Sequence, residues 1–570
     1  MRRTWQRMTL LGFASLLLGA CGIGWGLPSL QRLRSLLPEE RISDAGFHDR
    51  LAQGRDELYR QMETRGRLPD DYITQAESIP RGWQALSDRL LNSYRSFFLR
   101  SANADEQKNL TYLAHMKPWK LQFEPYGVGY GGAFIYPLGV YYGVLAVSGI
   151  VRVSSDIRIY LRDPRRMARV FLAGRWLSVF CITGCALLLY RLGSSLGGEA
   201  VGLSGALFFL ASPAAVLVGH TLNPYGWATL WFLLGCRKLC DHLDSGRRTD
   251  LLLGAGCVGL CVGSSYAFFQ AAVVLAAPLF RARSSGRRLS ETLLWIAEAL
   301  AVAGVVFVLT NPYLLLRPDK YMDELMYLNI GTDFPRTPGS FWVFVAEFLR
   351  RNWGLGLTLS ALAAMIGSWH PVFGPKERLL STAMIVGLFY MFGRTLDPGH
   401  ARHFLPYFAI GGVLAARLLW RIPKTRLGWL LTCLLLADTG AGGLCYLWNF
   451  RQEAKTGGTR AEAAAWIASH VPEGRSVGLL VPPQPHTTPP FRFDRYDLVL
   501  FTDPAQLKKG LHPDYVVLGG ADPVSPRVTE FLARDYALEA SFGPRRLLPW
   551  AALKGAWMAS NIEFGIYRRR

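Results

Sequence analysis

The chain has 570 residues, 50% of them hydrophobic, and its mean hydropathy is +0.17. This is too apolar for a single soluble domain and predicts a polytopic α-helical membrane protein. The formal net charge is +21, but the Arg and Lys residues cluster between apolar runs, as they do in loops that face anionic lipid. Composition therefore disfavours a nucleic-acid-binding protein.

All nine cysteines lie in apolar runs, and none falls within residues 28–166 or 450–570. The parts expected outside the membrane therefore have no disulfide framework. Three C-x-x-x-C pairs place two thiols one helical turn apart. That spacing is compatible with a metal site, but burial as small packing residues is the favoured interpretation.

The N-terminus begins with Arg2, Arg3 and Arg7, followed by an apolar run at 9–27. Positive charge before a first span predicts a cytoplasmic N-terminus. The letters LLGAC, ending at Cys21, also resemble a lipoprotein cleavage box, but the apolar run continues past the cysteine. Residues 28–100 are charged, show helical periodicity and contain no long apolar run, which predicts helices lying on the outer membrane surface.

Two adjacent acids, Asp105 and Glu106, follow this segment. A short helical run comes next, then two lysines and an aromatic, glycine-rich stretch that includes Tyr126. Acids beside a bilayer, followed by cations and aromatics, indicate a site of chemistry. The apolar segment 134–151 is long enough to span, but the sidedness of the later loops favours an interfacial helix.

The remaining apolar runs predict about eleven spans in total. They lie at 170–190, 201–218, 227–236, 251–263, 266–280, 293–316, 341–369, 379–392, 404–420 and 427–448. Counting crossings places Arg402 and His403 at the outer end of a span, in the same compartment as Asp105. The positive-inside rule gives no reason for cations there, so a phosphate ligand is the favoured explanation.

Residues 450–570 predict a separate small α/β domain outside the membrane. The stretch TRAEAAAWIASHVPEG is an amphipathic helix stopped by proline and glycine. The runs SVGLLV, YDLVLF, DYVVLGG and EFGIYRR are short strands. No nucleophile, metal or phosphate-loop motif occurs in this domain.

The order of these elements over residues 9–448 resembles the GT-C glycosyltransferases, the group that holds protein O-mannosyltransferases and lipid A aminoarabinose transferases. The resemblance is carried by ADEQ, YLAHM, FEPYGVGYGGAFIYPLG, GRWLSVF, the Asn-Pro-Tyr at 311–313 and HARHFLPYF. The segment 28–100 is longer than that pattern allows. The loop 219–225 lacks the second acid that many relatives carry, so no protein-held metal site is predicted, and a need for a divalent metal stays open.

The resemblance implies an inverting glycosyltransferase that moves a sugar from a polyprenyl-phosphate donor to an acceptor hydroxyl at the extracytoplasmic face. The acceptor is a protein, a lipid or a glycan. Residues 1–449 form the membrane domain, with a first outer loop at 28–166, and 450–570 the outer domain. Asp105 is the expected catalytic base. The expected substrate-binding residues are Glu106, Tyr126, His220, Asn223, Lys320, Arg402 and His403.

Two other functions stay open at this point. A transporter of lipid-linked sugars predicts a repeat between halves and broken midplane helices. A non-catalytic scaffold in envelope assembly is consistent with the missing second acid. The glycosyltransferase hypothesis makes the sharper spatial prediction, namely that Asp105 and Arg402 meet in one place.

Overall fold

The computed structural model describes residues 2–65, 73, 75–83, 86–125, 129–286, 288–319, 349–394, 402–421, 425–507, 511–520, 522, 524–545, 547 and 561–570. Helices dominate it. The helices of the membrane-type half are α1 (Arg2–Ala20), α7 (Gly132–Val147), α9 (Pro164–Gly197), α10 (Glu199–Ala211), α11 (Pro213–Gly219), α12 (Tyr225–Ser245), α13 (Arg248–Ser264), η2 (Tyr266–Ala276), α14 (Ala277–Ser285), α15 (Leu289–Thr310), α16 (Tyr313–Leu316), α19 (Arg350–Trp353), α20 (Leu355–Gly367), α21 (Pro375–Arg394), α22 (Leu405–Leu419) and α23 (Thr425–Thr456).

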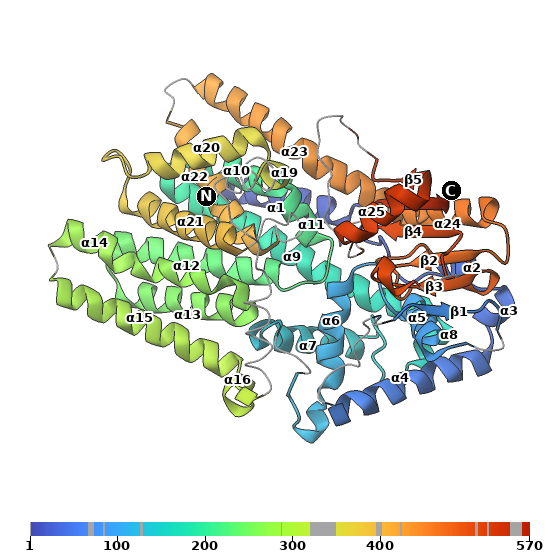
Figure 1. Ribbon diagram of the computed structural model, residues 1–570. Helices are drawn as coiled ribbons and strands as arrows, with labels where there is room; N and C mark the ends of the chain where they lie inside the picture. Colours follow the sequence, from blue (N-terminus) through green and yellow to red (C-terminus); the bar gives the residue numbers. More distant parts are fainter. Residues whose placement is uncertain are drawn as a thin grey trace.

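The other half of the molecule is mixed. Its helices are α2 (Leu30–Leu36), α3 (Glu39–Ile42), α4 (Ala45–Arg65), α5 (Asp88–Leu99), α6 (Ala104–His115), α8 (Arg158–Arg162), α24 (Gly458–His470) and α25 (Pro526–Asp535), with short 3₁₀ turns η1 (Pro118–Lys120), η5 (Phe493–Arg495) and η6 (Pro504–Gln506). Figure 1 shows the long apolar helices side by side on one side of the molecule and the sheet with α2, α5 and α24 on the other. Helix α6 lies between the two halves.

Three helices of the described chain are long and apolar enough to cross a membrane: α9, α15 and most of α23. A fourth span results if α10 and α11, which meet at a bend of 65°, are counted as one broken helix. The predicted count of about eleven spans is therefore not confirmed. Helix α7 is apolar and has 16 residues, and its position at the membrane interface stays a prediction.

The bend between α10 and α11 has a local cause. Pro213 follows Ser212 within the apolar run predicted as one straight span. Proline has no N–H to donate to the preceding turn, so the first helix ends there, and the Ser212 hydroxyl accepts a hydrogen bond from Ala215 to begin the second. The chain is thereby turned toward the loop that contacts α6.

The sheet has six strands in the order β1-β3-β2-β4-β6-β5. The strands are β1 (Glu77–Ile79), β2 (Ser476–Leu479), β3 (Asp497–Leu500), β4 (Tyr515–Gly519), β5 (Tyr536–Phe542) and β6 (Phe564–Arg569). The four runs expected as strands are β2, β3, β4 and β6. The central three are parallel, β6 is antiparallel to β4, and β5 was not expected.

The edge strand β1 comes from the segment that is longer than the GT-C pattern allows. It pairs antiparallel with β3, with Ser78 opposite Val499. Buried aromatic side chains join the same two regions, because Tyr94 and Phe97 of α5 each lie 5.8 Å from the ring of Phe493. The first loop therefore supplies an edge strand of the sheet. At the other predicted boundary, 449/450, helix α23 continues without a break to Thr456.

Candidate functional site

Asp105 lies in the first turn of α6. The side chain of Asn103 caps this helix and accepts hydrogen bonds from the backbone N–H groups of Asp105 and Glu106. One turn later, the Asn109 amide donates to the carbonyl oxygens of Asp105 and Leu222. The helix N-terminus favours a negative charge on Asp105, and the loop before α12 fixes the helix in place.

Asp105 and Arg402 form a buried ion pair. An Oδ2 of Asp105 lies 2.9 Å from Nη1 of Arg402, and the two side chains are 6% and 15% exposed. Lys108 lies farther away, with its Nζ 3.8 Å from Oδ1. The structure therefore brings Asp105 and Arg402 together, as the sequence predicts, although the two residues are far apart in the chain.

Aromatic side chains surround this pair. The Arg402 guanidinium lies 5.5 Å from the centre of the Tyr225 ring, and the Tyr225 hydroxyl is 2.9 Å from Nε2 of His403. Tyr130 lies edge-on to Tyr225, with ring centres 6.2 Å apart. Burial is the largest single influence on Arg402 and lowers its pKa, but the charges of Asp105, Tyr225 and Tyr130 together raise the pKa of the guanidinium above its ordinary value. Burial raises the pKa of Tyr130 well above its usual range, with Asp105 adding to the effect.

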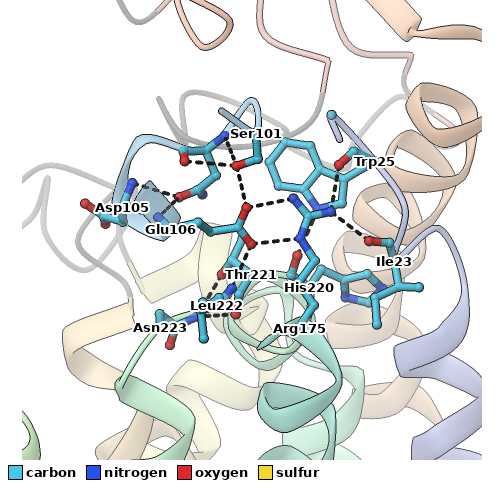
Figure 2. A network of polar contacts seen from close by, with 12 residues as sticks. Ile23, Trp25, Ser101, Asp105, Glu106, Arg175, His220, Thr221, Leu222 and Asn223 are labelled. Carbon is cyan, nitrogen blue, oxygen red and sulfur yellow. Dashed lines mark hydrogen bonds and ion pairs between the residues drawn. The ribbon is translucent and has the colours of Figure 1, made fainter. Parts of the chain in front are cut away.

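Glu106 lies next to Asp105 in the chain but belongs to a different network (Figure 2). Its carboxylate forms a two-point ion pair with Arg175, at 2.7 and 2.8 Å, and both side chains are 0% exposed. It also accepts hydrogen bonds from the Ser101 hydroxyl and the Leu222 N–H. Glu106 therefore has no oxygen facing a substrate, and its predicted binding role is not supported by the geometry.

Arg175 is satisfied as completely as Glu106. Its Nη1 donates to the carbonyl oxygens of Ile23 and Trp25 at 2.7 and 2.6 Å, and the guanidinium lies 4.9 Å from the Trp25 ring. These contacts tie the turn after α1 to α9. In Figure 2 the Asp105 carboxylate points away from this cluster. Arg175 therefore holds elements together and does not face Asp105.

His220 and Asn223 also serve the local backbone. The ring nitrogens of His220 lie 2.7 and 2.9 Å from the carbonyl oxygens of Val216 and Cys21, and its ring stacks on Phe450. The Asn223 amide donates within its own turn and accepts from the Tyr225 N–H. Both residues are buried. Both residues shape the loop that contacts α6, and their contact with substrate stays a prediction.

Two predicted site residues, Tyr126 and Lys320, lie outside the described residues. The sequence analysis overlooked the loop between β2 and β3. Arg100 donates to the Gln484 side chain in this loop, and burial together with the nearby charges of Arg100 and Arg460 lowers the pKa of His486 to about 4. A lone histidine in the proline-rich run PPQPHTTPP was the available signal.

Metal-binding side chains do not gather at the site. Among the described residues, no group of three or more His, Cys, Asp or Glu side chains is placed to hold a metal ion. The ion pair supplies one carboxylate, Asp105, and that carboxylate is engaged by Arg402. Among the described residues, this set of donors is too small for a resident divalent metal, and whether the protein needs one stays a prediction.

Comparisons with known proteins were made on the whole chain. No family model matches it, and no curated protein matches it. Among solved structures, it is similar to ArnT from Cupriavidus metallidurans bound to undecaprenyl phosphate, at 12% identity over 82% of this chain and 95% of that chain, with a TM-score of 0.42. It is also similar to the arabinofuranosyltransferase AftD from Mycobacteria, at 15% identity over 100% of this chain and 40% of that chain, with a TM-score of 0.41.

A third match is the oligosaccharyltransferase of Archaeoglobus fulgidus in the apo form, at 12% identity over 61% of this chain and 54% of that chain, with a TM-score of 0.37. The chain spans 51% to 58% of the length of the three structures of this oligosaccharyltransferase that it matches. All three are similarities of fold at 12% to 15% sequence identity. TM-scores below 0.5 assign no role to any residue, and the functional argument rests on the geometry of the site.

Proposed function

We propose that this protein is an inverting glycosyltransferase of the cell membrane, which moves a sugar from a polyprenyl-phosphate donor to an acceptor hydroxyl. The acceptor is a protein, a lipid or a glycan. The N-terminus lies in the cytoplasm, and the reaction and the C-terminal sheet lie outside. The observation that carries this proposal is the buried contact at 2.9 Å between Asp105 and Arg402.

Asp105 is the general base in this proposal. The attacking hydroxyl must lose a proton as its oxygen bonds to the anomeric carbon, and a carboxylate within hydrogen-bond reach accepts that proton. Asp105 stands in the first turn of α6 with the Arg402 guanidinium beside it. Attack from the face opposite the leaving phosphate inverts the anomeric centre.

Arg402 binds the phosphate of the donor. Negative charge develops on that phosphate as the sugar departs, and a guanidinium can donate to two of its oxygens at once. His403, held by Tyr225, lies beside it. In the absence of donor, Arg402 holds Asp105. A donor phosphate competes for the same guanidinium and frees the Asp105 carboxylate, so the base becomes available when the donor is bound.

The aromatic surroundings fit the sugar. Tyr130 and Tyr225 present ring faces and hydroxyl groups next to the ion pair. Flat aromatic surfaces pack on the C–H faces of a sugar, while phenol hydroxyls reach its oxygens. The same rings exclude water, which strengthens the attraction between the guanidinium and the donor phosphate.

The test is mass spectrometry of lipid-linked sugars and envelope glycans from cells that lack the protein, complemented with the wild type, Asp105→Asn or Asp88→Asn. Asp88 occupies the first turn of α5 and is exposed, so it is a matched control for an acid at a helix start. We expect one polyprenyl-phosphate sugar to accumulate with an empty vector and with Asp105→Asn, but not with Asp88→Asn. Normal glycans with Asp105→Asn at wild-type abundance would contradict the proposal and favour a scaffold.

A further inference from the structure

A second polar site lies apart from the Asp105–Arg402 contact. A cavity of about 160 Å³ opens where the turn after α1, helix α2, the end of α23 and the start of α24 meet. This is room for about five water molecules at their share of liquid volume. Neither Asp105 nor Arg402 lines it, whereas Arg32, Arg460 and Glu453 do.

Arg460 is the deeper of the two cations, with a side chain only 7% exposed. Its Nη1 donates to Glu453 at 2.5 Å and its Nε to the carbonyl oxygen of Pro485 at 2.9 Å. Its Nη2 is buried and has no hydrogen-bond partner in the described chain. A buried N–H of a charged group normally has a partner, because leaving it without one costs free energy.

Arg32 brings a second positive charge to the same cavity. Its Nη2 donates to the carbonyl oxygens of Phe97 and Arg100, while its Nε is buried without a partner among the described residues. Burial, and then repulsion from Arg460, lower the pKa of Arg32 to about 9. The hydrogen bonds that Arg32 makes within the described chain go to neutral carbonyl groups, and Glu453, the carboxylate that lines the cavity, is paired with Arg460.

Glu453 cannot balance both cations. One of its oxygens accepts from Arg460 and the other from the Asn561 N–H at 2.6 Å. The carboxylate is thus hydrogen-bonded on both sides, and the cavity retains one positive charge more than its negative charge. A buried charge of this kind is costly unless an anion enters.

We propose that this cavity is a binding site for a phosphate group, held by the guanidinium groups of Arg32 and Arg460, which both line it. Guanidinium groups match phosphate oxygens in geometry, and two of them complement the charge of a phosphate ester. Apolar side chains, Leu27 and Phe97 among them, line the rest of the cavity. The phosphate belongs either to a lipid head group or to a free phosphate ion, and the site does not depend on the glycosyltransferase proposal.

The test uses the full-length protein, purified in a non-ionic detergent and stripped of lipid. One arm titrates inorganic phosphate by calorimetry. The other adds phosphatidylglycerol, or diacylglycerol as the phosphate-free control, and counts retained lipid by native mass spectrometry. The variants are Arg32→Gln and Arg460→Lys. Arg34→Gln on the same helix α2 is the matched control, because Arg34 is 62% exposed and does not line the cavity.

We expect the wild type and Arg34→Gln to bind one phosphate group alike, and Arg32→Gln to bind it at least tenfold more weakly. Binding of phosphatidylglycerol but not of diacylglycerol identifies a lipid head group, and binding of inorganic phosphate alone identifies the free ion. Arg460→Lys decides the matter if Arg32→Gln does not fold. Equal binding by the wild type and a folded cavity variant, or no binding in either arm, overturns the proposal.

Discussion

Two buried ion pairs begin at neighbouring residues and differ in almost everything else. Glu106 and Arg175 are 0% exposed and joined at two points. Glu106 also accepts hydrogen bonds from the Ser101 hydroxyl and the Leu222 N–H, and Arg175 donates to backbone carbonyl oxygens. Asp105 and Arg402 meet at 2.9 Å, retain slight exposure, and lie among tyrosine rings. Adjacent acids on one helix turn have thus been given opposite environments.

The difference separates fixing a structure from reacting. A fully hydrogen-bonded pair gains nothing from a ligand, because a ligand could only displace a partner that is already well placed. A pair that retains slight exposure can be reached by a phosphate or a hydroxyl, which can take the place of one partner. The comparison therefore assigns stability to Glu106 and chemistry to Asp105, and the predictions below test that division from the largest effect to the smallest.

Asp105→Asn removes the base and keeps the size of the side chain. We expect glycosyl transfer to fall by about 10²–10⁴-fold, the usual contribution of a positioned general base. Transfer is measured in membranes with the lipid-linked donor that accumulates in cells lacking the protein. Thermal unfolding of the variant serves as the control, and its midpoint should fall less than that of Glu106→Gln, because the Asp105–Arg402 pair is slightly exposed and the Glu106–Arg175 pair is not. A loss of folded protein equal to the loss of activity would show that Asp105 is structural too.

Glu106→Gln should do the reverse. It leaves the Arg175 charge buried without its partner, which costs about 3–5 kcal/mol of stability. We expect a much lower yield of folded protein and a lower unfolding midpoint in detergent, measured by a fluorescence melt. The double variant Glu106→Leu/Arg175→Met removes both charges and should recover part of the midpoint. A stable Glu106→Gln protein with no transfer activity would reverse the division of roles.

Arg402→Lys keeps the charge but loses the planar fork. A lysine can satisfy Asp105, yet it binds a phosphate at one point where a guanidinium binds at two. We expect KM for the lipid-linked donor to rise by about 10–100-fold, corresponding to one or two hydrogen bonds to a charged group. KM for the acceptor should stay near the wild-type value. An increase confined to acceptor KM would place the donor elsewhere.

The ion pair could be predicted from the sequence, because the order of the apolar runs gives the side of the membrane on which each residue lies, and the residue type gives its charge. Counting crossings put Asp105 and Arg402 in one compartment, and the structure brings them together. The sequence could not identify Arg175 as the partner of Glu106, because an arginine near the start of a long apolar helix can equally well face lipid head groups. Three-dimensional packing alone distinguishes the two.

The same limit explains why the local hydrogen bonds of His220 and Asn223 were not foreseen. His220 and Asn223 contact backbone carbonyl groups. Every residue has such a group, so the sequence does not indicate which carbonyl will be the partner. Strand β1 was missed because three residues in a charged segment show no alternation. The break between α10 and α11 could have been predicted, because Pro213 cannot continue the helix that precedes it.

His486 extends the comparison to pH. Its folded pKa is about 4, below the value near 6.5 of an unfolded histidine, so the unfolded state takes up the proton first. The contribution of His486 to the free energy of unfolding is therefore fully present above pH 6.5 and decreases as the pH falls toward 4, by about 2 kcal/mol at pH 5. The measurement is the unfolding midpoint of the wild type and His486→Gln between pH 7.5 and 5. The difference between them should shift in favour of His486→Gln as the pH falls, and parallel curves would exclude His486 as the cause.

The smallest effects come from removing one hydroxyl beside each pair. Ser101→Ala removes a donor to Glu106, and Tyr225→Phe removes the group that contacts His403 next to Arg402. Each change is worth about 1 kcal/mol, or about fivefold. If the division is right, the first appears in the unfolding midpoint with transfer unchanged. The second appears in transfer, as a higher donor KM, with the midpoint unchanged. Two proteins altered in the same quantity would mean that the adjacent pairs act as one network, since a polar network shares its partners and a separated pair does not.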